Sequence, residues 1–576
     1  MNFRRSGNSS SSCNASVTTD PNTSLPVPDP YATPPRPWWQ RYPDWVWAAS
    51  VGALTVVATV MSFPPYNAPE LAYAFAVPAM FWAYRRPRFR LYAGTLLAAQ
   101  SIAWIALLWW LHPVTWAGLF LLGPIVGAWV GVWYLAAWWA LPRTLGRATL
   151  VRILAMIALA GVWVVVEWTR TWLLTGFPWL PLAASQWQRT SVLQIAAFTG
   201  AGGVSFVLVA VNIGFASVAH SLFHDRQTGW RLRRPEFLFA LFLLMVCVSV
   251  HVQVAFNRAR FSMPMARVAF VQPDIPQEVK WDPARGESIY QTLEKGTLVA
   301  AAGKPDLIFW PEASTPWAVR GDAGTRARIE SLVTRAGVPL VLGSIAIEQP
   351  NQPGEIWRNG MLVLTPDHGL ENDYYAKRHL VPFGEYVPLR FLFGWLDKFV
   401  PIGGDFSRGV SATPLRVQVR RAPLALGPLI CFEDIFPALA RADVRDGADF
   451  LFVATNDAWY GEAGGAYQHA AHSVLRAVET RRPVLRCGNA GWSGWIDEFG
   501  TIRSVMVDER DSIYFRGVKS VSVRRDFRWL GRRSFYVEHG DWFVAACAAL
   551  AALGWFVLRG GAVPLDVPKP ADVDAA

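Results

Sequence analysis

The stretch Pro428–Asp434, PLICFED, brings a strand and a reactive group together at one point of the chain. Apolar residues lead to a single cysteine, Cys431, at the end of what looks like a buried strand, and two carboxylates follow at once. Cysteine attacks as the thiolate and has a free pKa of about 8.5, so it needs a base or a cation nearby. The rest of the chain has to supply those groups.

Around this stretch, from residue 266 to 496, short apolar segments alternate with helical patterns. This alternation predicts a sheet covered by helices, with active groups at the ends of strands. Strands are expected at 268–271, 307–310, 339–345, 361–365, 415–419, 424–431, 450–454, 484–487 and 492–496, and helices at 325–336, 436–445 and 467–480.

Two charged residues follow apolar segments of this region. Glu312 comes directly after Phe309-Trp310-Pro311, and we expect burial there to raise its pKa toward that of a useful base. Lys377 lies in the stretch YAKRHLVPFGE at 375–385, and its charge would stabilise a thiolate and an oxyanion. Together with Cys431, these residues predict an activated thiol.

The chain is too apolar for a soluble protein, because 52% of its residues are hydrophobic and it holds 30 Trp, and its long apolar runs lie on the two flanks of this region. A bilayer core of about 30 Å needs about 20 helical residues. Most of the apolar runs meet that length, although the second is short. The runs lie at roughly 45–63, 71–84, 91–111, 116–141, 151–168, 192–220 and 237–255, with an eighth at Trp542–Leu558.

Arginine gathers in alternate loops between these runs, and the other loops are nearly bare. By the positive-inside rule the N-terminus is cytoplasmic and residue 256 onward lies outside. The net charge of +11 therefore indicates membrane orientation rather than nucleic-acid binding. The predicted parts are a disordered cytoplasmic tail at 1–43, a seven-helix membrane domain at 44–255, an extracytoplasmic catalytic domain at 256–540, an eighth transmembrane helix at 541–558 and a cytoplasmic tail at 559–576.

Three motifs, WPE at 310–312, HLVPFGE at 379–385 and ICFE at 430–433, resemble the catalytic boxes of the nitrilase superfamily. With membrane spans on both sides, the chain resembles the apolipoprotein N-acyltransferases, membrane members of that superfamily, from about residue 45 to 558. The segment 272–281 and the motif TNDAW at 455–459 match further family segments.

The resemblance implies a multi-span helical membrane domain joined to an αββα sandwich with the catalytic triad Glu312, Lys377 and Cys431. It implies that a phospholipid gives its acyl chain to Cys431 as a thioester. The α-amino group of S-diacylglyceryl cysteine at the N-terminus of an apolipoprotein then takes the chain as an amide. No cofactor and no metal are implied, and the location implied is the bacterial inner membrane, with the catalytic domain in the periplasm.

The resemblance also carries supporting roles. Glu385 and Glu433 would orient Lys377 and the nucleophile, and Trp281 would be a lipid-site or gating residue. Family members usually have tyrosine after the nucleophile, whereas this chain has Phe432. The ring is kept and the hydroxyl is not, so we expect the position to act by packing.

Other residues leave alternatives open. Asn456 and Trp459 follow a strand and would either line the substrate pocket or stabilise their loop. His469 and His472 lie three apart on an expected helix, where surface or interface histidines are favoured over a metal site or a base for the cysteine. The aromatic loop 169–190 would be an interfacial belt or a lipid-entry surface.

Two rival functions remain at this point. A membrane-tethered amidase of the nitrilase type would use the same triad and pass its acyl group to water, since only water exclusion and the amine site separate the two. A transporter or scaffold would need no triad. Under that hypothesis, the occurrence of a Glu, a Lys and a Cys at three strand ends would be a coincidence.

Overall fold

The computed structural model of the chain describes residues 42–224, 234–280, 282–388, 390–394, 406–419 and 422–560. The chain divides into two compact units, 1–47 and 48–576, and the described part of the first is little more than the start of α1. Almost all of both predicted tails, and Trp281, fall outside the described residues.

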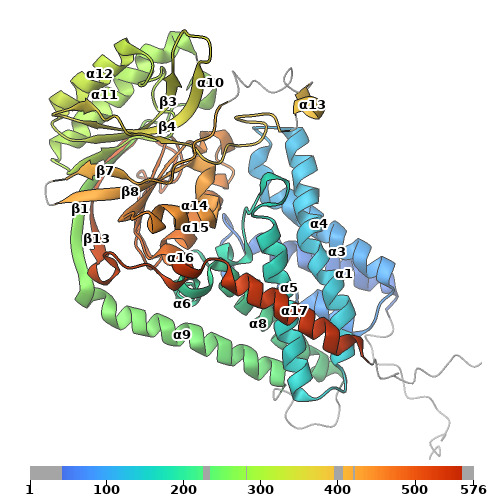
Figure 1. Cartoon of the computed structure of the whole chain (residues 1–576). Helices are drawn as coiled ribbons and strands as arrows, with labels where there is room; N and C mark the ends of the chain where they lie inside the picture. Colours follow the sequence, from blue (N-terminus) through green and yellow to red (C-terminus); the bar gives the residue numbers. More distant parts are fainter. Residues whose placement is uncertain are drawn as a thin grey trace, which may run out of the picture. The chain divides into compact units, whose positions relative to one another are not determined.

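The longer unit is helical up to Phe261, in blue to green in Figure 1. Apolar residues cover most of each long helix, as expected of helices that meet lipid or one another rather than water. The helices are α1 (Asp44–Met61), α2 (Val77–Tyr84), α3 (Phe89–Leu107), α4 (Trp116–Ala140), α5 (Thr149–Thr169), α6 (Thr190–Leu193), α7 (Ala196–Thr199), α8 (Ala201–His224) and α9 (Pro235–Phe261).

Six helical segments in the described part of the chain are long and apolar enough to cross a bilayer, so this is a membrane protein. They are Asp44–Met61, Trp116–Thr144, Thr149–Thr169, Ala201–Phe223, Pro235–Phe261 and Trp542–Arg559. The run at 71–84 folds instead as a 3-10 turn and the short α2, and α3 carries Arg90 and Gln100. The expectation that the chain crosses the membrane seven times before residue 256 stays a prediction.

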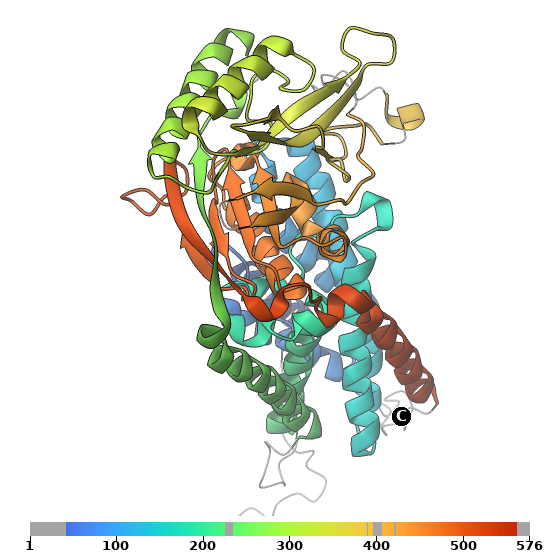
Figure 2. The ribbon, with the colours of Figure 1, turned by 60° about the vertical axis from the view of Figure 1, so that its left-hand side comes forward.

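The expected αββα sandwich is confirmed as two sheets that face each other, as Figure 2 shows. The first has the order β13-β1-β2-β3-β4-β5, with β6 paired to β4, and the second β12-β11-β10-β9-β8-β7. The strands are β1 (Ser262–Gln272), β2 (Leu307–Phe309), β3 (Leu340–Glu348), β4 (Ile356–Thr365), β5 (Gly369–Leu370), β6 (Tyr375–Ala376), β7 (Leu415–Gln418), β8 (Pro423–Ile430), β9 (Phe450–Thr455), β10 (Val484–Gly488), β11 (Gly494–Ile496), β12 (Ile502–Val505) and β13 (Gly517–Asp526).

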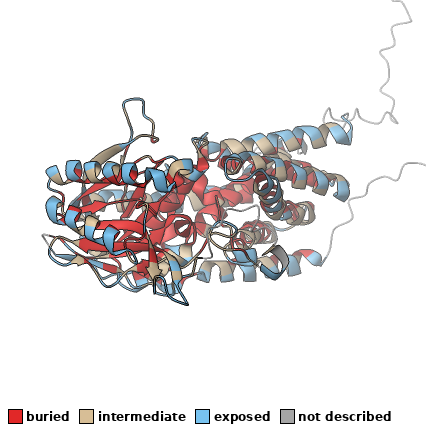
Figure 3. Ribbon diagram, turned by 90° about the horizontal axis from the view of Figure 1, so that it is seen from above, coloured by how far each residue is buried: buried red, intermediate tan, exposed pale blue. Residues whose placement is uncertain are grey.

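Two apolar cores hold the sandwich. One lies between the sheets and includes Phe309 and Phe452, whose ring centroids are 4.2 Å apart. The other lies under α11 (Gly286–Ala302) and α12 (Ala323–Ala336), which cover the first sheet. In Figure 3 the buried residues concentrate in the strands. Helices α14 (Pro437–Arg445) and α15 (Gly465–Thr480) pack on the second sheet.

Strand β13 was not expected from the sequence. It pairs antiparallel with β1 from Ser262↔Asp526 to Gln272↔Gly517 and so closes the first sheet. Helix α9 runs to Phe261, past the predicted boundary at residue 255, and Arg258 and Arg260 lie in its last turn, where positive charge favours the helix dipole. After β13 come α16 (Phe535–His539) and α17 (Trp542–Arg559), and α17 packs against α5.

Candidate active site

Cys431 stands at the turn between β8 and a five-residue 3-10 helix, η9 (Cys431–Ile435). Its φ of 51° lies in the left-handed region, which costs a residue other than glycine on the order of 1 kcal/mol. The side chain is buried. Because β8 and β9 are parallel, Cys431 and the residues after β9 share one edge of the second sheet.

Glu312 follows β2 in the facing sheet and is 7% exposed. The backbone of Gly343 passes close to it, with the Gly343 N–H bound to the Pro311 carbonyl at 3.1 Å. A Cβ on Gly343 would lie 2.7 Å from the Glu312 Cα, which is closer than real Cβ contacts come. Glycine at 343 therefore lets β3 support the turn that carries Glu312.

Lys377 follows β6 and is 1% exposed. Its Nζ lies 3.2 Å from Glu312 Oε1 and 3.0 Å from Glu385 Oε1. The Asn359 amide donates to the same two carboxylates at 2.9 Å each. Glu385 also accepts from the Val381 N–H at 2.8 Å, which fixes it on its own turn. The buried carboxylate of Glu312 and the partly buried carboxylate of Glu385 thus share one ammonium and one amide.

The charges in this cluster are coupled. Burial alone would raise the pKa of Glu312, but Lys377 and Lys280 outweigh it, so the pKa lies below its usual value. The expectation of a raised pKa for Glu312 was wrong, because the charges of Lys377 and Lys280 together outweigh the effect of burial. Burial lowers the pKa of Lys280 to about 8, and its Nζ donates to the Glu312 carbonyl at 3.0 Å.

The pKa values of the Cys431 thiol and of the Lys377 ammonium are both raised. Burial, followed by the charge of Glu312, raises the pKa of the Cys431 thiol, and Lys377 opposes this. Burial would lower the pKa of Lys377, but Glu385 and Glu312 raise it well above its usual value. The resting site therefore holds a neutral thiol beside an ionised carboxylate and an ammonium, so a proton can pass from Cys431 to Glu312.

Glu433, fully buried, ties the cysteine turn to the lysine segment. Its carboxylate accepts from the N–H groups of Ile430 at 2.8 Å, Arg378 at 2.7 Å and His379 at 3.0 Å, and from the Tyr375 hydroxyl at 2.8 Å. These bonds join residues on both sides of Lys377 to the strand that ends at Cys431. The contacts support a positioning role for Glu433.

The ring of Phe432 packs among aromatic side chains. It lies 6.2 Å from Phe177, 6.0 Å from His379 and 5.2 Å from Phe436, measured between ring centroids. This environment is apolar, which supports the expectation that the position acts by packing without a hydroxyl.

Asn456 and Trp459, the two residues expected either to line the pocket or to stabilise their loop, differ in how far they are buried. Asn456 is 2% exposed and is held by Gln277 at 2.7 Å and Asn489 at 2.9 Å, so its amide joins the end of β9 to the 272–280 segment. Trp459 is 44% exposed. The geometry favours a loop-stabilising role for Asn456, while a substrate contact at Trp459 stays a prediction.

The loop 170–187 packs against this site. Trp179 and Trp187 are buried, with Trp187 donating to Asn67 Oδ1 at 2.8 Å, so neither is an exposed belt residue. Phe177 contacts Phe432, and the Trp179 indole donates to Gln468 Oε1 at 2.8 Å. Trp172 is 51% exposed and remains available to an interface.

His469 and His472 are both fully buried, so of the two expected positions, surface or interface, the surface one is wrong. His472 Nε2 accepts from the Leu180 N–H at 3.2 Å, and His469 contacts Asp434 and Asp457. Cys431 and Cys487 are both free thiols. No group of three His, Cys, Asp or Glu in the described residues could hold a metal ion.

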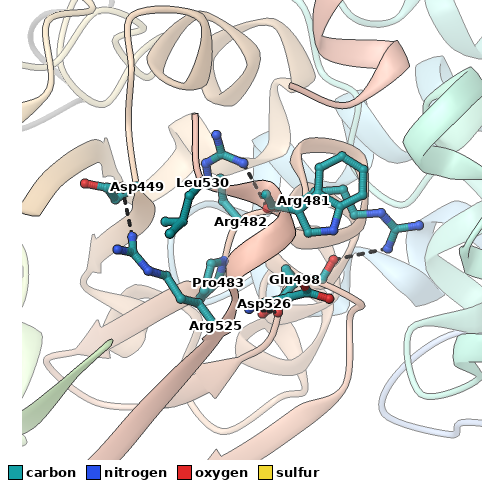
Figure 4. Close-up of a pocket in the computed structure, with 9 residues that line it drawn as sticks. Asp449, Arg481, Arg482, Pro483, Glu498, Arg525, Asp526 and Leu530 are labelled. Atoms are coloured by element: carbon teal, nitrogen blue, oxygen red, sulfur yellow. Dashed lines mark hydrogen bonds and ion pairs between the residues drawn. The ribbon is translucent and has the colours of Figure 1, made fainter. Parts of the chain in front are cut away.

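A separate pocket, shown in Figure 4, contains none of these residues. It is lined by charged side chains that already pair, such as Asp449 with Arg525 at 2.8 Å. Asp449 and Pro483 precede β9 and β10, so this pocket lies at the opposite end of those strands from Cys431. It is not part of the reactive cluster.

Asn359 and Lys280 were missed from the sequence. Asn359 is a buried polar residue at the start of the apolar part of strand β4, which could have marked it, because a buried amide needs partners. Lys280 belongs to a four-residue helix, α10 (Gln277–Lys280), too short to leave a pattern.

Comparison with known proteins agrees with this architecture. The carbon-nitrogen hydrolase family matches residues 267–529, and the apolipoprotein N-acyltransferase N-terminal domain matches residues 55–214. An apolipoprotein N-acyltransferase of Geobacter metallireducens is 33% identical over 517 residues, 87% of this chain and 94% of the relative. The chain belongs to the apolipoprotein N-acyltransferase family.

Further relatives of this family cover much of the chain as well. One from Vibrio vulnificus is 27% identical over 76% of this chain and 81% of its own length. Among solved structures, an amidase from Nesterenkonia sp. AN1 is 15% identical, with a TM-score of 0.33, over 45% of this chain and 93% of the amidase.

Proposed function

We propose that this protein transfers a fatty acyl chain from a phospholipid to the N-terminal amine of S-diacylglyceryl cysteine on an apolipoprotein, through a thioester on Cys431. The observation that carries the proposal is the buried pair of Lys377 and Glu312 beside the Cys431 thiol, in a chain of this family. A thioester reacts readily with amines, which suits an amine acceptor.

In the first half-reaction Glu312 takes the thiol proton, and Cys431 Sγ attacks the ester carbonyl carbon of the lipid. Negative charge builds on the carbonyl oxygen, where the Lys377 ammonium and the Phe432 backbone N–H would stabilise it. The ester C–O bond then breaks, and the leaving lysophospholipid oxygen takes the proton from Glu312. The acyl group remains on Sγ.

In the second half-reaction the amine attacks the thioester carbonyl and Glu312 accepts a proton from the attacking nitrogen. The C–S bond breaks, the amide leaves, and the proton returns to Sγ. Both substrates carry acyl chains, which need an apolar surface to bind. The apolar helices that precede and follow the sandwich in this chain therefore support the proposal. The amidase alternative differs only in that water replaces the amine.

Incubation of the purified protein with phospholipid alone tests the first half-reaction. We expect intact mass spectrometry to show one acyl adduct, removable by hydroxylamine and absent in Cys431→Ala. A diacylglyceryl peptide should then discharge the adduct with amide formation. Discharge to free fatty acid, with no amide, would support the amidase. Activity on the peptide without any adduct would exclude the thioester route.

We further propose that the protein lies in the bacterial inner membrane with its sandwich in the periplasm, which the arginine-rich alternate loops support. Single cysteines replacing Val410, 94% exposed, and Arg559, at the far end of α17, test this in spheroplasts of a Cys13→Ser background. A membrane-impermeant maleimide should label the first in intact spheroplasts and the second only after lysis. The reverse pattern would invert the topology.

A further inference from the structure

A cluster of four fully buried polar residues lies directly behind the cysteine turn and takes no part in the mechanism above. Asp434 comes from η9, Asp457 from the 3-10 helix η10 (Asp457–Tyr460), His469 from α15 and Arg486 from β10. Arg486 bonds Asp434 at 2.9 Å and Asp457 at 3.2 Å. Two acids and a guanidinium therefore enclose the imidazole of His469.

The Nε2 atom of this imidazole meets only acceptors. It lies 2.9 Å from Asp434 Oδ1 and 3.1 Å from the backbone carbonyl oxygen of Cys431. A nitrogen between a carboxylate and a carbonyl carries its hydrogen, whatever the charge of the ring. The other nitrogen, Nδ1, lies 2.9 Å from Asp457 Oδ1 and 2.6 Å from Arg486 Nη2, and the Nε2 contacts are the same whether or not Nδ1 carries a hydrogen.

A hydrogen bond to the Cys431 carbonyl controls more than that oxygen. In a planar trans peptide the carbonyl and the following N–H point in opposite directions. Holding the Cys431 carbonyl toward His469 therefore turns the Phe432 N–H away from it. The backbone at Cys431 has a φ of 51°, so this peptide needs outside support to keep its orientation.

We propose that His469 is a positioning residue for acyl transfer: it holds the Cys431–Phe432 peptide so that the Phe432 N–H faces the oxyanion formed on Cys431. The inference rests on the proposed function, because it concerns the oxyanion of that reaction. Asp434 keeps the ring in place, and Ser473 and Arg486 keep Asp434 in place, at 2.6 and 2.9 Å.

The helix offers a matched control. His472, three residues on, is equally buried, but its Nε2 accepts from Leu180 and not from the cysteine turn. Replacing either histidine by alanine removes the same imidazole from the same helix. Only His469→Ala should free the Cys431 carbonyl.

Two rates, both measured on the full-length protein, separate a positioning role of His469 from a role in the stability of the site. One is acyl-enzyme formation from phosphatidylglycerol, which needs the oxyanion. The other is alkylation of Cys431 by iodoacetamide, a displacement at carbon that forms no oxyanion. In His469→Ala we expect acylation to fall about 100-fold, the usual effect of losing one oxyanion donor, and alkylation to stay within about 3-fold.

In His472→Ala the ratio of the two rates should match the wild type. His469→Gln, whose amide can donate to the same carbonyl, should recover part of the acylation rate and provides a second test if the alanine variant does not fold. Acylation unchanged in His469→Ala, both rates falling together, or the same selective loss in His472→Ala would each overturn the proposal. A wild type without acyl adduct would instead refute the proposed function.

Discussion

Glu312→Gln is expected to change two reactions of Cys431 in opposite directions. Acyl-enzyme formation should fall about 10³-fold, because the general base is gone. Alkylation of the same thiol by iodoacetamide at pH 8 should become about 3 to 10 times faster. Glu312 raises the pKa of the Cys431 thiol, and removing its charge increases the thiolate fraction at a given pH.

In a Cys13→Ser background, intact mass spectrometry measures both products on one protein sample. Glu509→Gln, an exposed carboxylate remote in sequence from the site, should leave both rates unchanged. If alkylation slowed together with acylation, Glu312 would be shaping the site rather than accepting the proton. The opposite signs make this a stricter test than loss of activity alone.

Lys377→Met should also lower acylation by about 10³-fold, or about 4 kcal/mol of activation free energy. The substitution keeps most of the volume and removes the ammonium that lies 3.2 Å from Glu312 Oε1 and 3.0 Å from Glu385 Oε1. The buried oxyanion and the two carboxylates would then lack their main compensating charge.

The pH profile of Lys377→Met separates this from a packing defect. In the wild type the pKa of Glu312 lies below its usual value of 4.5, so Glu312 stays ionised and acylation should not decline on the acid side down to about pH 5. Without Lys377, the effect of burial loses the largest charge that opposes it, so the pKa of Glu312 rises. The residual rate should then fall with decreasing pH at higher pH values than in the wild type, while exposed Lys304→Met keeps the wild-type profile.

The sequence was sufficient to predict the meeting of Glu312, Lys377 and Cys431. Each follows an apolar strand or a turn motif, and ends of strands in facing sheets lie near each other. The family motifs gave the same three positions. Glu385 and Glu433 followed from those motifs and now have partners on the lysine and cysteine segments.

Other features depend on contacts between distant segments. Strand β13, with the sequence GVKSVSVRRD, is a half-exposed edge strand. Its many polar residues give no clear strand pattern, and the strand is defined by its pairing with β1. The sequence favoured a surface or interface position for His469 because its partners Asp434, Asp457 and Arg486 are contributed by three other elements. The pKa of Glu312 is lowered by Lys377 and by Lys280, and the role of Lys280 depends on a contact between the 272–280 segment and the turn after β2.

The side chain of Gln468 connects α15 with the helical half of the chain. Its oxygen accepts from the indoles of Trp110 and Trp179, and its nitrogen donates to the carbonyls of Pro64 and Leu107 at 3.0 and 2.9 Å. Nearly all of α15 is buried.

This arrangement has a consequence for biosynthesis. A ribosome completes every segment that receives Gln468 well before it reaches α15, so the docking surface can already be in the bilayer when the catalytic region emerges. If residues 262–526 were expressed alone, the Gln468 amide would lose its partners, and the face of α15 that packs on the helical half would be exposed to water. Inhibitor screens on this protein therefore require the entire chain in detergent or lipid.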